Sequence, residues 1–190
     1  MAAAVAEPSI LAVAYVGIDN SPAYFRSFLN VEAAPMVAVG GEGPSTEAEA
    51  DKPDLKQLVL GAQEQLEDHI RNAVQAMQRG DGRSTDPFLG VLTPTLVDGK
   101  DCSVYGYISA CNMKVLVLAL DHGVSNSKDL QTPILRSLLR QLHQFYVDAF
   151  CNPFFVSLDT PSFRAKVDTA VDRHNAKLAQ FLLAAAAAAA

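Results

Sequence analysis

The chain has 190 residues, of which 49% are hydrophobic and 19% are charged, and its formal net charge is −6 at pH 7. This length suits one ordinary domain, and the charged fraction lies below the roughly 25% of a typical soluble domain, so some apolar surface is expected to await a partner. The acidic balance argues against a protein that binds nucleic acid or anionic lipid, because such proteins need a basic face to neutralise phosphates.

Both ends of the chain have a composition of their own. Residues 1–9 predict a disordered leader, because no basic segment precedes the apolar run and Glu7-Pro8 interrupts it. The alanines at 184–190 predict an extension of the last helix, since alanine is the best helix former. No run in the sequence approaches the roughly 20 apolar residues of a membrane span, so no transmembrane segment is expected.

The first structured segment is a strand over residues 10–16, ILAVAYV, which is apolar on both alternating faces and therefore covered on both sides. A turn at residues 19–22 leads to a second, less apolar strand over 23–29. Residues 31–53 carry four Glu, three Pro and a Gly-Gly pair without a usable period. That composition predicts a flexible acidic insertion within one domain that spans 10–183.

Residues 54–78 predict one amphipathic helix, with its apolar stripe on one side and a polar face on the other. Glu64, Glu67 and Asp68 share the polar face with Arg71, so we interpret them as a solvated surface and not as a general acid and base. The glycines at 80 and 82 end the helix.

Three strands follow, over residues 88–93, 104–108 and 115–120. The first runs into Pro94, and the last, VLVLAL, is again apolar on both faces. Residues 110–113 join the second and third strands as a hairpin turn.

Two helices close the chain. Thr132-Pro133 predicts the start of the first and Asn152-Pro153 its end, because proline suits a first helical turn and disfavours helix in the residue before it. Thr160-Pro161 repeats the same start for the last helix. We expect three phenylalanines between these helices to be core anchors that fix how the last helix folds back, namely Phe150, Phe154 and Phe155.

The predicted order is therefore β-β-α-β-β-β-α-α. The strands over 10–16 and 115–120 should be central neighbours, since both of their faces are apolar. The other two strands, which have Pro22 and Pro94 next to one end, should be edges. This pattern predicts an α+β layered domain.

Cys151 is the first candidate for chemistry. Its nearest potential base, His143, lies eight residues away on the same helix, about 12 Å of rise, so the two cannot touch. We therefore interpret Cys151 as a packed thiol near a helix end. The other histidines, His69, His122 and His174, share no metal-ligand spacing and are expected to be structural or solvated.

The remaining motifs also predict no catalytic, cofactor or metal site. Three cysteines without a Cys-x-x-Cys do not form a disulfide framework, and a strand of about 30 Å would separate Cys102 from Cys111. All three thiols suit a reducing cytosol. The sequence contains neither a phosphate-binding P-loop nor a Gly-x-Ser-x-Gly motif.

Three stretches carry a family resemblance: FLGVLTPT at 88–95, SVYGYISACNMKVLVLALD at 103–121 and ILRSLLRQLHQFYVDAFCNPFF at 134–155. They resemble the sedlin-like subunits of the transport protein particle (TRAPP) tethering complexes. The likeness extends over roughly residues 10–172, apart from the insertion. Its most specific positions are Tyr105, Gly106, Tyr107, His143, Asp148, Cys151, Asn152, Pro153 and Phe154.

The resemblance implies a longin (SNARE-like) fold, with a five-stranded antiparallel sheet, one helix on one face and two on the other. It also implies a non-enzymatic subunit, without a cofactor, that is cytoplasmic and peripheral at endoplasmic reticulum and Golgi membranes. Its partners would be other TRAPP subunits and, through the whole complex, a Rab GTPase and the vesicle membranes. Those complexes tether vesicles and carry out nucleotide exchange as an assembly.

Three other functions stay open. A longin-domain SNARE would need heptads and a membrane anchor after the domain, which residues 161–190 do not contain. An adaptor-type small subunit of a vesicle coat is closer to this pattern, and a cysteine-dependent enzyme or small-ligand pocket protein is the third alternative. Replacement of Cys151 separates that third alternative from an assembly subunit.

A subunit of an assembly must expose surface that a monomer would cover. We therefore expect partner contacts on the helix over 54–78 and on the edges of the sheet. The candidate contact residues on the helix are Leu58, Gln65, Asp68 and Asn72.

Overall fold

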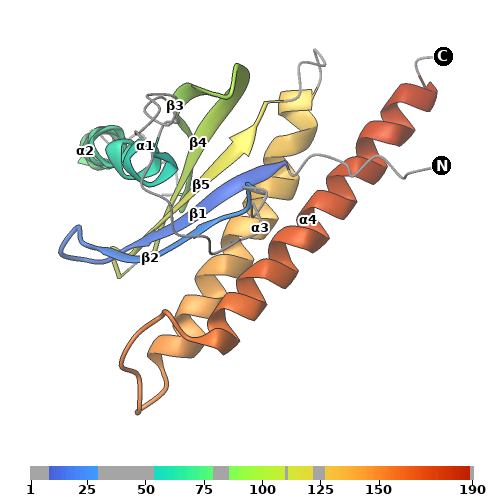
Figure 1. The fold of residues 1–190 in the computed structure, drawn as a ribbon. Coiled ribbons are helices and arrows are strands. Elements are labelled where there is room, and N and C mark those ends of the chain that lie inside the picture. Colours follow the sequence, from blue (N-terminus) through green and yellow to red (C-terminus); the bar gives the residue numbers. More distant parts are fainter. Residues whose placement is uncertain (1–8, 30–53, 79–85, 110, 122–126, 189–190) are drawn as a thin grey trace, which may run out of the picture.

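The computed structural model describes residues 9–29, 54–78, 86–109, 111–121 and 127–188 (Figure 1). The predicted leader, apart from Ser9, and the predicted insertion lie outside these ranges. The elements within them are β1 (Ile10–Val16), β2 (Pro22–Ser27), α1 (Leu55–Gly61), α2 (Gln63–Gln78), β3 (Phe88–Val97), β4 (Lys100–Ile108), β5 (Lys114–Leu120), α3 (Ser127–Phe150) and α4 (Pro161–Ala188).

The five strands form one antiparallel sheet in the order β2-β1-β5-β4-β3. The two strands that are apolar on both faces, β1 and β5, are central neighbours, and all of their residues are buried. Pro22 and Pro94 lie on the edge strands β2 and β3, where a strand leaves one side of its backbone without a ladder partner. The predicted placement of these four strands is confirmed.

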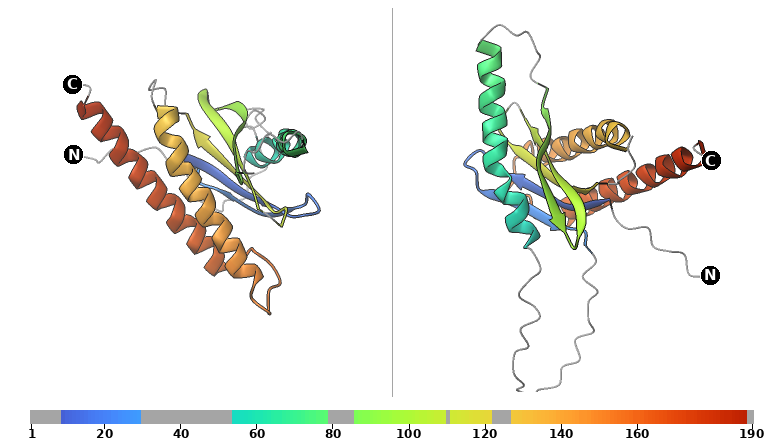
Figure 2. Two further views of the ribbon diagram at one scale, coloured as in Figure 1. Left: turned by 180° about the vertical axis from the view of Figure 1, so that it is seen from behind. Right: turned by 90° about the horizontal axis from the view of Figure 1, so that it is seen from above.

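Helices cover both faces of the sheet, so the fold has three layers. Helices α1 and α2 lie on one face, and α3 and α4 lie side by side on the other (Figures 1 and 2). Alternation along the central strands divides the core accordingly: Val115 and Val117 pack towards α3 and α4, whereas Leu116 and Leu118 pack towards α1 and α2. The predicted α+β longin-like architecture is confirmed.

The helix expected over 54–78 is interrupted at Ala62. Asp54 caps α1, its side chain accepting a hydrogen bond of 3.0 Å from the Lys56 backbone N–H. At the break the Ala62 N–H donates a hydrogen bond to the Leu60 carbonyl. Gly61 precedes Ala62, and glycine loses more conformational freedom in a helix than any other residue. Because Ala62 and Leu66 are both buried, the apolar stripe continues across the break.

Strands β3 and β4 and helix α3 are each longer than predicted, and β4 begins at Lys100 instead of residue 104. Strand β3 passes through Pro94 and continues to Val97, because a missing N–H matters little on an edge. Helix α3 begins at Ser127, so the predicted start at Thr132-Pro133 is wrong and Pro133 lies inside the helix. Pro133 has no backbone N–H, so it cannot donate one of the helical hydrogen bonds. Packing of the apolar face of α3 outweighs this loss, because such packing supplies most of the stability of a helix in a protein.

The end of α3 and the extension of α4 agree with prediction. Helix α3 ends at Phe150, two residues before Asn152. The alanines continue α4 as far as Ala188. All three cysteines are free, and the register explains why Cys102 and Cys111 do not meet: Cys102 pairs with Leu120, at the far end of β5 from the β4–β5 turn that holds Cys111.

Candidate assembly surfaces

Cys151 lies in the turn that follows α3 and is exposed, so its interpretation as a packed thiol is wrong. Its backbone N–H bonds the Val147 carbonyl at 2.9 Å, as the last link of the helical ladder. The connection between α3 and α4 projects past the sheet (Figure 1). His143 instead faces Tyr107 on β4, with 5.4 Å between the ring centroids, and burial lowers the pKa of its imidazole.

The Tyr-Gly-Tyr segment of β4 has a steric explanation. Tyr105 and Tyr107 join the core on the α3 and α4 side of the sheet, and Gly106 faces the opposite layer. A Cβ atom on Gly106 would lie 2.8 Å from Cδ1 of Leu92, which is itself buried. The close approach of this side chain to the backbone therefore requires glycine.

The polar residues at the end of α3 serve local structure. The Asn152 side-chain oxygen accepts a hydrogen bond of 3.0 Å from the Phe154 backbone N–H, and its carbonyl accepts one of 2.9 Å from the N–H of Phe155. Asp148 accepts a hydrogen bond from Gln144 one helical turn earlier, at 2.8 Å. Asn152 thus stabilises the turn after α3, whereas Asp148 pairs with a residue of its own helix.

Two of the three predicted core anchors face solvent. Phe150 is 58% exposed and Phe154 is 86% exposed, so the prediction for them is wrong, whereas Phe155 is half-buried and packs against the core. Apolar character alone does not distinguish a residue that fills a core from one that lies on a surface. Here Phe150 is the last residue of α3, and Phe154 lies in the turn that follows it.

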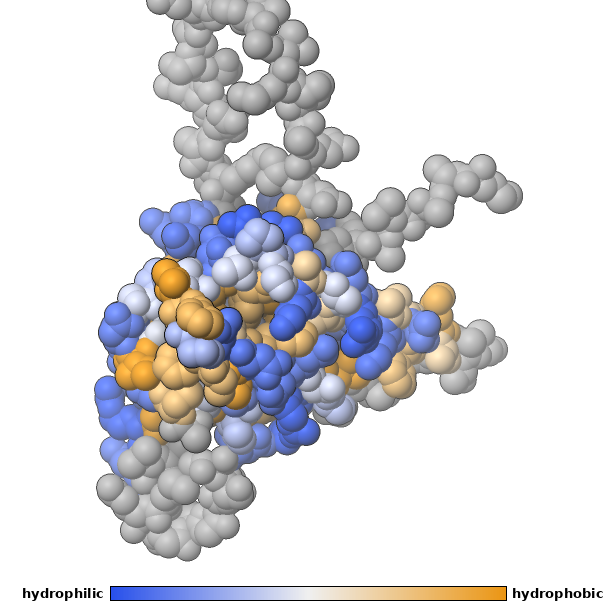
Figure 3. All heavy atoms as spheres, turned by 90° about the horizontal axis from the view of Figure 1, so that it is seen from below, coloured by the Kyte–Doolittle hydropathy of each residue, from blue (hydrophilic) through white to orange (hydrophobic). Residues whose placement is uncertain are grey.

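Phe150, Phe154 and Val156, which is 92% exposed, form a surface that we call the connection patch. Figure 3 shows apolar side chains gathered on the face of the molecule that carries the α3–α4 connection. A hollow of about 450 Å³ adjoins the patch, and Asp148 and Lys166 are among its lining residues. The sequence signal was Phe-Phe-Val directly after a proline, an apolar run that belongs to no helix or strand.

The four predicted contact residues on α1 and α2 do not share one environment. Gln65, Asp68 and Asn72 are exposed and follow one another at helical spacing, so they lie on one face of α2. Asp68 pairs with Arg71 at 3.1 Å. Leu58 is half-buried and packs into the core beneath α1, which removes it from this polar face.

Both edge strands have features that disfavour pairing with a further strand. Strand β3 contains Pro94 and two register shifts against β4. On the other edge, β2 is short and begins at Pro22. Exposed apolar side chains lie on β3, where Val91 and Leu96 are 43% and 62% exposed.

Within the described residues, no group of three or more His, Cys, Asp or Glu side chains is arranged to hold a metal ion. His69 is exposed, His174 is buried, and His122 lies outside the ranges. No helix in that part of the chain combines the length and apolarity that crossing a bilayer requires.

Comparison with known proteins shows the family of the chain. The profile of the Sedlin family matches residues 44–174, which leaves β1 and β2 outside the match. The trafficking protein particle complex subunit 2-like proteins of Xenopus tropicalis and Rattus norvegicus are 33% and 34% identical over 98 residues, which is 52% of this chain and 65% of each relative. The protein of the same name from Dictyostelium discoideum is 24% identical over 148 residues, 77% of this chain and 82% of the relative.

The chain thus spans about two thirds of the length of the vertebrate relatives and a larger share of the amoebal one. The family match covers more than half of the chain, from the predicted insertion to the middle of α4. The fold agrees with it, since the sheet and both helical layers are those that the sedlin-like resemblance implies. The chain belongs to the Sedlin family.

Proposed function

We propose that this protein is a non-enzymatic subunit of a TRAPP complex, acting by protein–protein assembly in vesicle transport between the endoplasmic reticulum and the Golgi. The observation that carries the proposal is the Sedlin match over residues 44–174, together with relatives named as subunits of a trafficking protein particle complex. In such an assembly the chain would be cytoplasmic and peripheral at membranes. Its link to a Rab GTPase would be indirect, through the complex.

The connection patch is the surface best suited to a lasting contact. Its side chains are 58% to 92% exposed, and burying apolar surface against a partner is favourable by about 25 cal/mol per Å². Aromatic residues are also enriched at the centres of protein interfaces. The polar face of α2, formed by Gln65, Asp68 and Asn72, would be a second, more hydrated contact.

The proposal is tested by affinity purification of the tagged full chain from cells, followed by quantitative mass spectrometry. We expect several other TRAPP subunits to be recovered at comparable abundance. Recovery of coat-adaptor subunits in their place would favour an adaptor-type small subunit, and recovery of a SNARE bundle would favour a longin SNARE. Either result would overturn the proposal, as would recovery of none of these proteins.

Two variants refine the experiment. Cys151→Ser should recover the same subunits as the parent chain, because the thiol is exposed and His143, its nearest potential base in the sequence, packs on Tyr107. A cysteine-dependent enzyme would instead lose an activity on this change. Phe154→Ser combined with Val156→Ser should reduce recovery, whereas Leu183→Ser, which changes a 72% exposed apolar residue at the other end of α4, should not.

A further inference from the structure

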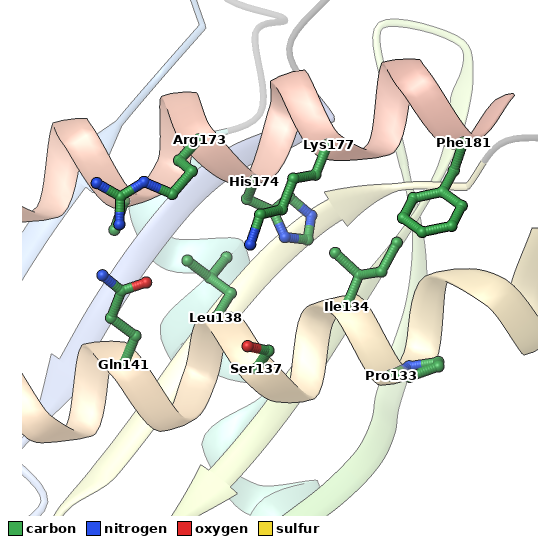
Figure 4. A pocket seen from close by; sticks show the side chains of 10 residues that line it. Pro133, Ile134, Ser137, Leu138, Gln141, Arg173, His174, Lys177 and Phe181 are labelled. Carbon is green, nitrogen blue, oxygen red and sulfur yellow. The ribbon is translucent and has the colours of Figure 1, made fainter. Parts of the chain in front are cut away.

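A groove of about 390 Å³ lies between α3 and α4, away from the connection patch (Figure 4). Helix α3 contributes residues 133–141 to it and α4 contributes residues 170–181. Eight residues of helical rise give the groove a length of about 12 Å. The side chains that matter for its chemistry are Ile134, Gln141, Arg173, His174, Lys177 and Phe181.

The groove contains a buried imidazole without a partner. His174 is 4% exposed and extends from α4 towards α3, between Leu138 and Ile134 in the view of Figure 4. Neither Nδ1 nor Nε2 makes a hydrogen bond within the described residues. Burial, and secondly the charge of Lys177, lower the pKa of His174 to about 4, so near neutral pH the ring is uncharged and offers one N–H donor and one acceptor.

Buried polar atoms in native proteins nearly always have a partner, and an unpartnered one is explained by strain, a functional role or an unseen bound group. His174 lies among the groove-lining residues, so a group bound in the groove would be the partner it lacks. Neither ring nitrogen is hydrogen-bonded to α3, whose lining residues are Pro133, Ile134, Ser137, Leu138 and Gln141 and include no titratable side chain.

The groove changes from polar to apolar along its length. Arg173 and Gln141 face each other at one end, Phe181 and Ile134 lie at the other, and Lys177 and His174 lie between them (Figure 4). Phe181 is 50% exposed, so its ring gives this end of the groove a large apolar surface. Arg173 and Lys177 are exposed cations to which no carboxylate of the described residues is bonded, in a chain whose net charge is −6.

We propose that this groove binds a single-chain amphipathic carboxylate of the fatty-acid type. Its head lies between Arg173 and Lys177 and accepts a hydrogen bond from the His174 N–H, while its alkyl chain covers Ile134 and Phe181. A carboxylate accepts hydrogen bonds and donates none, which matches an arginine, a lysine and an imidazole N–H that all donate. The short length of the groove and the depth of His174 favour a thin molecule over a partner helix, which is about 10 Å across. This inference does not depend on the proposed function.

Binding is measured by titrating the purified, isotope-labelled full chain with decanoate, below its micelle concentration, in two-dimensional NMR. We expect saturable shifts confined to residues 133–141 and 170–181. Decanol, which lacks the charge, and acetate, which lacks the chain, should each bind at least tenfold more weakly. Equal binding of decanol, shifts centred on Phe154 and Val156, or no saturable shift would each overturn the proposal. Decyl phosphate binding more tightly than decanoate would also overturn it, by assigning the head to a phosphate.

Matched variants place the head. Lys177→Gln and Arg173→Gln should each weaken decanoate about tenfold, whereas Lys166→Gln, an exposed lysine on the same helix outside the groove, should leave the affinity unchanged. His174→Leu should also weaken binding while keeping or raising the thermal midpoint of the free protein, because it removes buried polar atoms without partners. Unchanged affinity in all three groove variants would contradict the assignment even where one of them folds poorly.

Discussion

Arg26 on strand β2 donates two parallel hydrogen bonds to the carboxylate of Asp168 on helix α4, each 3.0 Å long. The two side chains are 42% and 35% exposed, and they come from opposite ends of the described chain. This paired geometry gives both strength and direction to the contact. The pair thereby links the edge strand β2 to helix α4. The Phe28 ring lies beside it, with its centroid 6.0 Å from the Arg26 guanidinium carbon.

Asp168→Asn should lower the free energy of unfolding by about 1 kcal/mol, because a partly exposed bidentate pair lies at the upper end of surface ion pairs. Urea unfolding of the single variants, Arg26→Gln and the double variant measures the coupling between the two side chains. Simple additivity of the two single effects would show that the pair contributes nothing as a pair. Arg164→Gln, which breaks the more exposed contact with Asp159, is the matched comparison and should cost less.

Gly106→Ala should destabilise the fold by about 1–3 kcal/mol, the usual cost of forcing extra volume into a packed core. The new methyl group would lie 2.8 Å from Cδ1 and 3.1 Å from Cγ of Leu92, so that side chain must move. Chemical denaturation measures the effect, and Gly106→Ala should cost less in a chain that already carries Leu92→Ala, because the clashing side chain is then absent. If Gly106→Ala were neutral, the Tyr-Gly-Tyr segment would not owe its glycine to this contact.

The periodicity of the sequence was sufficient for most of the fold. Strands β1 and β5 are apolar at every position, and only a site covered on both faces satisfies such a strand, so their central placement followed from the residues themselves. Proline confined β2 and β3 to the edges by the same kind of argument. Asn152-Pro153 likewise marked the end of α3 correctly.

The errors arose where local signals compete with tertiary packing. Thr132-Pro133 has the features of a helix start, but helix already precedes it from Ser127. Phe150 and Phe154 were predicted to be core anchors, but an exposed apolar patch can have the same composition as a core. His174 could not be recognised as the floor of a groove, because its lining residues come from two helices and share no motif.

Acid should destabilise the protein through His174. The pKa of His174 is about 4 in the folded protein and near 6.5 in the unfolded chain. Between these two pH values the unfolded chain binds more protons, so the free energy of unfolding falls as pH decreases. The full contribution is present above about pH 6.5 and is lost as pH falls through 4, a change of about 3 kcal/mol at most. His174→Leu removes this part of the pH dependence. Unfolding curves of both proteins at several pH values test it, and parallel declines would contradict the shifted pKa.

The connection patch should affect assembly and not folding. Phe154→Ser with Val156→Ser should change the free energy of unfolding by no more than about 0.5 kcal/mol, since both side chains are already in solvent. Phe163→Ala is the contrasting variant and should cost about 3–5 kcal/mol, because its buried ring packs edge-on against Tyr15 and Tyr24. Thermal or chemical unfolding measures both, and a large loss in the serine variant would place the patch within the folding core.

The central claim is that this member of the Sedlin family acts as a stable subunit of a TRAPP complex. Size-exclusion fractionation of a cell extract, with the tagged chain and the other TRAPP subunits quantified in each fraction by mass spectrometry, tests it most directly. We predict that the chain elutes far above its own mass of 20.3 kDa and keeps a constant ratio to those subunits across the peak. Elution at its own mass, or in a peak that contains no TRAPP subunit, would contradict the claim.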